Sequence, residues 1–273
     1  MLNFKDVLYG TISLPEWLLP FVKLPEFLRL RGVRLSNVDS FQFKDFNGPT
    51  RWDHGLAAAY LATIAAQKRG LGESDSVHLI LASLLHDVGT PPFAHTAEYV
   101  IDDFDHEAET QRLLAGFDGD SARTDYPVFA SQLPAFGKTC TSLSKTLGIA
   151  ISPEEVARLV MGEGDLGFLI KGTIDLDNAD NVTRACLHLG ISVDPQVPLK
   201  VAAWLGGQEH MPSLESASEP AVQKWLEYRS AMYGAFFSSS DEELGRQAFL
   251  QHLMREALAA ELPRNALIWK TDD

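Results

Sequence analysis

Two long stretches of this chain are apolar on nearly every helical face, a pattern typical of buried helices. From His54 to Arg69 the sequence is dominated by Ala, Leu and Ile, and Gly70 follows as a stop. A second such stretch, residues 76–86, opens after Ser74 and is followed by Gly89 and two prolines. Both are too apolar to lie on a surface, so the pattern predicts a pair of core helices.

Helical periodicity recurs along most of the remaining chain. Ser152 is the expected N-cap of one such segment, and Gly190 the expected end of another. The predicted helices cover residues 26–31, 106–114, 153–161, 175–189, 221–237 and 241–262.

Two regions lack this periodicity. Residues 6–50 are short apolar stretches broken by Gly and Pro, which suits short strands and turns. Residues 121–141 carry two prolines and no clean period, so a loop with short helical pieces is predicted there. The expected fold is all-α, with strands confined to a short N-terminal β-hairpin before residue 50.

The length suits one large core. The 273 residues are 45% hydrophobic, without internal repeats or low-complexity tracts. The most linker-like segment, Pro212–Pro220, brings no shift in composition. We expect a single domain over residues 1–273, with its core motifs in 51–190 and C-terminal helices in 217–262.

Charge and cysteine content narrow the functional classes. The formal charge is -14 and the pI about 4.9, which disfavours duplex nucleic acid as the main partner but admits a small phosphorylated molecule entering a metal-lined pocket. Cys140 and Cys186 lack the paired spacing of a disulfide frame or a zinc site. Met1–Gly10 does not resemble an export signal, and no apolar run is long enough to span a membrane. We expect a cytoplasmic protein.

The most informative chemistry is an adjacent His-Asp pair, His86-Asp87, at the end of a predicted core helix. Neighbouring residues on a helix point about 100° apart, so both can bind one ion only near a helix end. His54 begins the preceding helix and Asp177 begins a later one. Alone, such a histidine is usually a core or capping residue, and such an aspartate a cap. Together they offer nitrogen and oxygen ligands on rigid elements, as a metal that activates water requires.

The order of these motifs resembles one known superfamily. The motifs are Arg51-x-x-His54, then Leu84-Leu85-His86-Asp87-x-Gly89-x-Pro91-Pro92-Phe93-x-His95, His106-Glu107, and Asp175-x-Asp177-x-x-Asp180-x-x-x-Arg184. Upstream stand Asp6-x-x-x-Gly10-x-Ile12 and Pro25-Glu26-Phe27-x-Arg29-Leu30-Arg31. The chain resembles the HD-superfamily hydrolases and is most similar to the deoxynucleoside triphosphate triphosphohydrolases, a likeness that fades after about Ile191.

The resemblance implies roles for nine residues. It implies that the metal ligands are His54, His86, Asp87 and Asp177. Proton transfer and contact with the leaving group would fall to His95, Glu98 and His106. Arg51 would touch a substrate phosphate, and a weaker alignment places Arg229 at a second phosphate-binding position.

The chain also departs from the family pattern. Thr90 stands where the family commonly has a histidine after the doublet. The lysine, tyrosine and aspartate that grip phosphate and sugar in the family correspond here to Asn178, Asn181 and Ala185. An acidic protein without that lysine is poorly supplied with charge for a triphosphate. The metal chemistry is therefore expected to be intact while nucleotide recognition is altered.

The leading hypothesis is a phosphohydrolase with one divalent ion, Mn, Fe, Mg, Zn, Co or Ni, acting on a nucleotide or a related small phosphorylated metabolite. A second interpretation makes His95 or His106 a ligand of a second ion, giving a dinuclear phosphodiesterase or, with iron, an oxygenase. A third is a nucleotide-sensing module that keeps the fold and turns nothing over.

Other polar and aromatic residues are interpreted as structural. Asp180 and Arg184, spaced i and i+4, are expected to pair and orient the helix of Asp177. The remaining histidines are assigned to packing or to solvent: His78, His188, His210 and His252. An aromatic run fits the core or an interface between identical subunits better than a base-stacking platform: Tyr228, Tyr233, Phe236 and Phe237.

Overall fold

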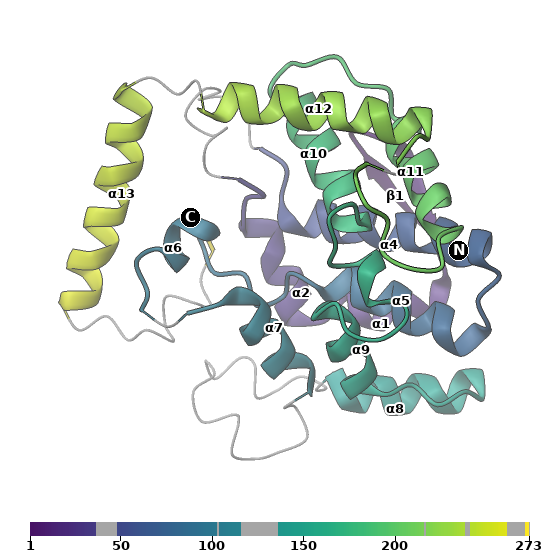
Figure 1. The fold of residues 1–273 in the computed structure, drawn as a ribbon. Coiled ribbons are helices and arrows are strands. Elements are labelled where there is room, and N and C mark those ends of the chain that lie inside the picture. The colour runs from purple at the N-terminus through teal and green to yellow at the C-terminus, as the bar shows by residue number, and fades with distance from the viewer. Residues whose placement is uncertain are drawn as a thin grey trace.

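The computed structural model describes residues 1–36, 48–102, 104–115, 136–215, 217–237, 241–260 and 271–272. Helices dominate this part of the chain (Figure 1). Its strands form one two-stranded antiparallel sheet. The predicted all-helical class with an N-terminal hairpin is confirmed.

The hairpin opens the chain. β1 (Leu2–Asp6) pairs with β2 (Gly10–Leu14). Asp6 closes the turn between them, because its Oδ1 accepts the backbone N–H groups of Leu8 and Tyr9 at 2.8 and 2.9 Å. Short helices follow as η1 (Glu16–Leu18), α1 (Leu19–Val22), α2 (Pro25–Arg29) and η2 (Leu30–Gly32). The last two correspond to the brief helix predicted over 26–31.

Two helices form the centre of the fold, α4 (Arg51–Arg69) and α5 (Glu73–Leu85). Each begins three residues before its predicted start, and Gly70 ends α4 in the left-handed conformation, with φ 68°. Gly55 permits close packing around α4, since a Cβ there would lie 2.7 Å from the Phe27 ring and 2.8 Å from the Leu84 carbonyl oxygen. α4 therefore runs close to the end of α5, where the His-Asp doublet follows.

Four shorter helices follow, α6 (His95–Glu98), α7 (His106–Ala115), α8 (Phe136–Leu147) and α9 (Pro153–Val160). Ser152 caps α9 as predicted, because its Oγ accepts the Glu155 N–H at 3.1 Å. Residues 121–141 were predicted to be loop with short helical pieces, but from residue 136 the chain forms a 12-residue helix, α8, that continues beyond this region. Residues Phe136, Cys140 and Leu143 are buried at helical spacing, a period hidden by the prolines before them. Residues 121–135 lie outside the described part.

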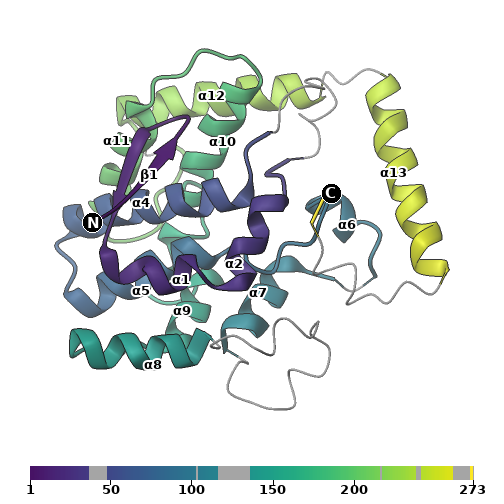
Figure 2. The ribbon, with the colours of Figure 1, turned by 180° about the vertical axis from the view of Figure 1, so that it is seen from behind.

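The C-terminal half adds α10 (Leu176–His188), α11 (Gln196–Gly206), α12 (Pro220–Phe237) and α13 (Asp241–Ala259). α11 was not among the predicted helices. It packs tightly on α4, since a Cβ on Gly206 would lie 2.4 Å from the Ala65 carbonyl oxygen. α12 lies across one end of the fold, and α13 stands at the margin near α6 (Figures 1 and 2).

Both cysteines, Cys140 and Cys186, are buried and free. Among the helices that the structure describes, none combines the length and apolar character needed to cross a membrane.

Candidate metal centre

The first turn of α4 carries Arg51 and His54, and a capping box fixes that turn. Thr50 Oγ1 accepts the Asp53 N–H at 3.2 Å, and Asp53 Oδ2 accepts the Thr50 N–H at 3.2 Å. Residues three apart lie on one helical face. Arg51 and His54 therefore point in the same direction, and both are buried.

The doublet leaves the helix as the sequence predicts. α5 ends at Leu85, and His86 is its C-cap. The His86 Nδ1–H donates to the Ser83 carbonyl oxygen at 2.8 Å, so Nε2 is the nitrogen that faces the site. Thr90 donates its hydroxyl to Asp87 Oδ1 at 3.1 Å. The residue that replaces a histidine of the family pattern thus holds one oxygen of the doublet carboxylate.

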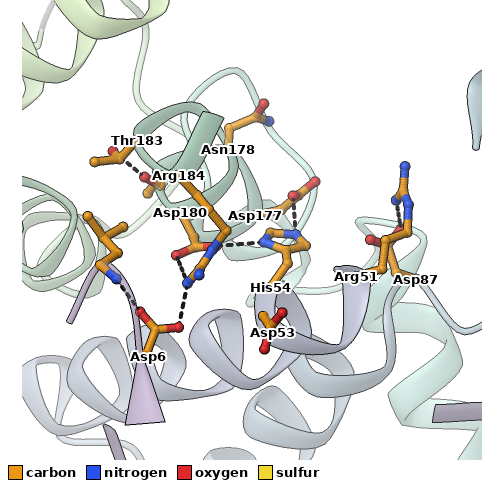
Figure 3. Close-up of polar contacts among 12 residues, drawn as sticks. Asp6, Arg51, Asp53, His54, Asp87, Asp177, Asn178, Asp180, Thr183 and Arg184 are labelled. Atoms are coloured by element: carbon orange, nitrogen blue, oxygen red, sulfur yellow. Dashed lines mark hydrogen bonds and ion pairs between the residues drawn. The ribbon is translucent and has the colours of Figure 1, made fainter. Parts of the chain in front are cut away.

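Asp177 enters from the start of α10. Asp175 is the N-cap of that helix and accepts the Asn178 N–H at 2.7 Å and the Gly172 N–H at 2.8 Å. The cap places Asp177 in the first helical turn, facing His54 (Figure 3).

The four predicted ligands meet in one place. His54 Nε2 lies 3.2 Å from His86 Nε2 and 2.9 Å from Asp177 Oδ1. His86 Nε2 lies 3.7 Å from Asp177 Oδ1 and 3.5 Å from Asp87 Oδ2. Atoms about 2.0–2.2 Å from one ion lie roughly 3.0–3.5 Å from one another in tetrahedral or octahedral geometry. The spacing suits one small divalent ion.

Two observations show that these residues fit a metal. Both histidines use Nδ1–H as a donor, His54 to Asp180 Oδ2 at 2.8 Å and His86 to Ser83. Two neutral rings would therefore turn two lone pairs toward each other across 3.2 Å, which a shared cation relieves. In addition, Asp87 Oδ2 is buried without a hydrogen-bond partner among the described residues.

The electrostatics also favour positive charge at this point. Burial lowers the pKa of His54, but the hydrogen bonds to Asp177 and Asp180 outweigh it and raise the pKa to about 10. Burial alone would raise the pKa of Asp177, yet the hydrogen bonds from His54 and His86 hold it well below its usual range. The carboxylates around the two rings therefore favour a cation at this point.

A buried network supports His54 from behind (Figure 3). The Asp180 carboxylate accepts three hydrogen bonds, each at 2.8 Å, from His54 Nδ1, Arg184 Nε and the Tyr9 hydroxyl. Arg184 also binds Asp6 at 2.9 Å. The predicted pair of Asp180 and Arg184 is present, but its contact with His54 was missed. One feature of the sequence hints at this contact: Asp180 lies three residues after Asp177, which puts both carboxylates on the same face of the helix.

A second polar cluster joins α6 to α7. Glu98 binds the ring Nδ1 of His95 at 2.6 Å through Oε2, and the ring and backbone N–H of His106 through Oε1. Burial lowers the pKa of His106, but the hydrogen bond to Glu98 outweighs it and raises the pKa. The three predicted proton-transfer residues therefore lie together, with His95 the most exposed.

Arg51 and Arg229 have different surroundings. Arg51 binds Asp87 Oδ1 at 2.6 Å and is buried with it. Arg229 lies on α12 with its guanidinium 4.9 Å from the centre of the Tyr233 ring. Among described residues, those lining the cavity at the metal centre include Arg51 and Tyr233 but not Arg229.

Both clusters open into this one cavity, whose volume is about 710 Å³. Its lining includes the three positions where the chain departs from the family, Asn178, Asn181 and Ala185. The lining also includes large side chains from three helices: Tyr99 at the end of α6, Tyr233 of α12 and Leu244 of α13. The aromatic run is therefore divided, since Tyr228 is buried in the core. The side chains of Phe236 and Phe237 lie outside the described part.

His78, one of the histidines predicted to be structural, connects α5 to the start of α9. Its Nδ1–H donates to the Ser74 carbonyl oxygen at 2.7 Å, and its Nε2 accepts the Ser152 N–H at 3.0 Å. These contacts confirm its packing role.

Comparison with known proteins adds a family to this geometry. Residues 51–123 match the HD domain family. A deoxynucleoside triphosphate triphosphohydrolase SAMHD1 homolog of Dictyostelium discoideum is 25% identical over 69% of this chain and 36% of that protein. A deoxyguanosinetriphosphate triphosphohydrolase-like protein of Rhodopseudomonas palustris is 39% identical over 26% of this chain and 20% of that protein.

A solved structure of a phosphohydrolase from Bacteroides thetaiotaomicron superposes with a TM-score of 0.72 at 18% identity, covering 99% of this chain and 65% of that one. That likeness concerns the fold. The chain spans less than half the length of the curated relatives it matches.

Proposed function

Because this chain contains an HD domain, we propose that it is a metal-dependent phosphohydrolase acting on a nucleotide or a related small phosphorylated metabolite. The observation that carries the proposal is the convergence of His54, His86 and Asp177 within 3.7 Å of one another. The names of the triphosphohydrolase relatives support the reaction class.

The four ligands would hold one divalent ion, which when bound supplies Lewis-acid polarisation of a phosphoryl oxygen and a water of lowered pKa. Arg51 would offset the charge that develops on the phosphoryl oxygens, from its position against Asp87. His95 lines the cavity and directs Nδ1 to Glu98, so Nε2 is the ring nitrogen left for a substrate. That nitrogen would hold and transfer the proton at the leaving oxygen, with Glu98 and His106 fixing the ring.

The charge of the cavity favours a substrate with few phosphate groups. Among described residues, its cationic side chains are Arg51 and Lys171, each already paired with a carboxylate, Asp87 or Glu107. Each further phosphate group adds about one negative charge that would need a partner. Asn178 and Asn181 offer neutral amides instead. A monophosphate ester fits this wall better than a triphosphate, with an apolar or aromatic portion lying against Tyr99 and Tyr233.

Product analysis tests the proposal. Protein loaded with Mn²⁺ is incubated with nucleoside mono- and triphosphates, sugar phosphates and phosphodiesters. The expected result is metal-dependent release of product, greatest for monophosphates and abolished in His86→Ala. Binding without product from any compound would contradict the proposal and favour the nucleotide-sensing alternative.

A dinuclear phosphodiesterase is the second candidate. The observation that favours it is that His95, Glu98 and His106 offer ligand atoms within 4.8 Å of one another. A second ion there would have to displace the ring protons that now bind Glu98. Counting metal by plasma spectrometry separates the candidates, because the mononuclear enzyme holds about one ion per chain.

A further inference from the structure

Asp272 joins two distant segments of the chain. Its Oδ1 accepts the Phe93 N–H at 2.8 Å, and its Oδ2 accepts the Arg34 N–H at 2.8 Å. Its own N–H donates to the Gly32 carbonyl oxygen at 2.8 Å. One carboxylate therefore holds two backbone donors 59 positions apart in the sequence.

The packing around this contact is tight. A Cβ on Gly32 would lie 2.6 Å from Thr271 Cγ2, so residues 271–272 press directly on η2. The C-terminal label stands beside α6 in both views (Figures 1 and 2). Asp272 thus lies between the N-terminal part of the chain and the segment that leads into α6.

The first of the two segments borders Arg51. Arg34 forms an isolated antiparallel bridge with Thr50, the cap of α4. The Arg51 N–H donates to the Val33 carbonyl oxygen at 2.9 Å, and the Leu35 N–H donates to the Pro49 carbonyl oxygen at 2.8 Å. Fixing the Arg34 N–H therefore also fixes the backbone from which Arg51 projects.

The second segment borders His95 and has an uncommon backbone. Phe93 has φ 62° and Ala94 has φ 46°, values that residues other than glycine rarely adopt. Such a conformation costs free energy and persists only where surrounding contacts hold it. Asp272 supplies one of those contacts, two residues before His95.

Arg29 holds the same segment at its other end. Its guanidinium donates to the Val88 and Thr90 carbonyl oxygens at 3.1 and 2.7 Å. Burial lowers the pKa of Arg29 to about 10, and the negative charge of Asp272 opposes that shift. Arg29 and Asp272 are thus electrostatically coupled across the segment from the doublet to α6.

We propose that Asp272 is a positioning residue for His95 and Arg51, acting through the backbone of residues 93–94 and 33–34. This inference rests on the proposed function. The carboxylate has two acceptors for two donors, so Asp272→Asn keeps one of them as an acceptor while Asp272→Ala removes both.

The test compares Asp272→Ala and Asp272→Asn with wild type and with Asp165→Ala, which removes an exposed carboxylate elsewhere. Steady-state kinetics use the best substrate of the panel, with metal content and amide exchange measured in parallel. For Asp272→Ala we expect kcat to fall by about 10- to 100-fold with KM and metal content near wild type, as for a misplaced catalytic group. Asp272→Asn should recover part of the loss, and Asp165→Ala should match wild type.

Amide exchange reports the same contact without turnover. In Asp272→Ala, residues 93–98 should exchange faster while α4 and α5 remain protected. Unchanged kcat with unchanged exchange would overturn the inference. A fall in metal content and melting temperature together with a raised KM would also overturn it, because that pattern marks general destabilisation. If wild-type protein releases no product from any compound, the proposed function fails, while exchange still decides whether Asp272 holds the 93–94 backbone.

Discussion

At the candidate metal centre, the hydrogen-bond partner of one ring nitrogen decides which nitrogen of each histidine is left to bind an ion or a substrate. His54 and His86 both direct Nε2 to the centre because Asp180 and the Ser83 carbonyl oxygen occupy Nδ1. His95 differs, since its Nδ1 binds the Glu98 carboxylate. His54 and His86 are therefore expected to act as ligands, and His95 to act in proton transfer.

Replacing His95 and His86 separates those roles. His95→Ala should leave metal content near wild type while turnover falls by about 10² to 10⁴, the range for losing general acid-base help. His86→Ala should lose metal, because it removes a ligand and leaves two carboxylates less well compensated. Metal content and initial rate are measured for both. Loss of metal in His95→Ala would move His95 into the ligand set.

Asp180 should control metal affinity without touching the ion. Burial raises its pKa, but Arg184 and His54 outweigh this and bring the pKa to about 2, so a full negative charge faces the His54 ring. Asp180→Asn keeps the shape and removes the charge. We expect metal affinity to fall by about 10- to 100-fold, measured by titration calorimetry. Equal affinity would show that the network only packs α10.

Helix ends, more than helix interiors, place the site. Arg51 and His54 lie in the first turn of α4, Asp177 in the first turn of α10, and the doublet just after α5. The caps of α4 and α10 therefore fix the turns that carry the predicted site residues.

Two caps allow a matched comparison. Thr50→Ala and Ser152→Ala each remove a side-chain acceptor at a helix start, and each should lower the free energy of unfolding by about 1 kcal/mol. Only Thr50→Ala should also weaken metal binding, because α9 carries no ligand. Urea unfolding and metal titration measure the two effects. Weakened binding in Ser152→Ala would show that binding follows stability in general.

The stabilisation that Glu98 provides by binding His95 and His106, between α6 and α7, should depend on pH. Burial raises the pKa of Glu98, but the hydrogen bonds from His106 and His95 outweigh it and lower the pKa. That contribution to stability is present above the unfolded pKa of about 4.3 and is lost as pH falls. The raised pKa of His106 gives a contribution present below about 6.5 and lost as pH rises through the folded value.

The contributions of Glu98 and His106 to stability are both present between about pH 4.3 and pH 6.5. The melting temperature of Glu98→Gln should fall furthest below wild type near pH 5 to 6, and the difference should shrink as pH rises through the folded pKa of His106. A difference that stays constant across pH would mean that the charges of this cluster do not contribute.

At the scale of the whole molecule, the metal would link two consecutive helices, α4 and α5, to α10, which follows about ninety residues later. A ligand that binds only the folded state stabilises it by about 2.7 kcal/mol at 100 times its Kd. Removing metal with a chelator should therefore lower the melting temperature, and adding the metal back should restore it. His86→Ala serves as the control, since chelation should leave it unchanged. An equal shift in both proteins would mean that the chelator acts elsewhere.

The sequence by itself determined the helical class, the hairpin and most helices, and the order of its motifs, through their resemblance to a known superfamily, singled out the four residues that the structure brings together. Periodicity and caps are local, and the spacing of the doublet at a helix end is local too. What tertiary structure alone decided are contacts between residues far apart in the chain. These include the Asp180 support of His54, the placement of Tyr233 in the cavity and Tyr228 in the core, and the Asp272 contacts. Such contacts depend on how helices pack, which no single segment encodes. α8 and α11 were missed for a related reason, since prolines within or before them mask a pattern that packing against the core makes helical.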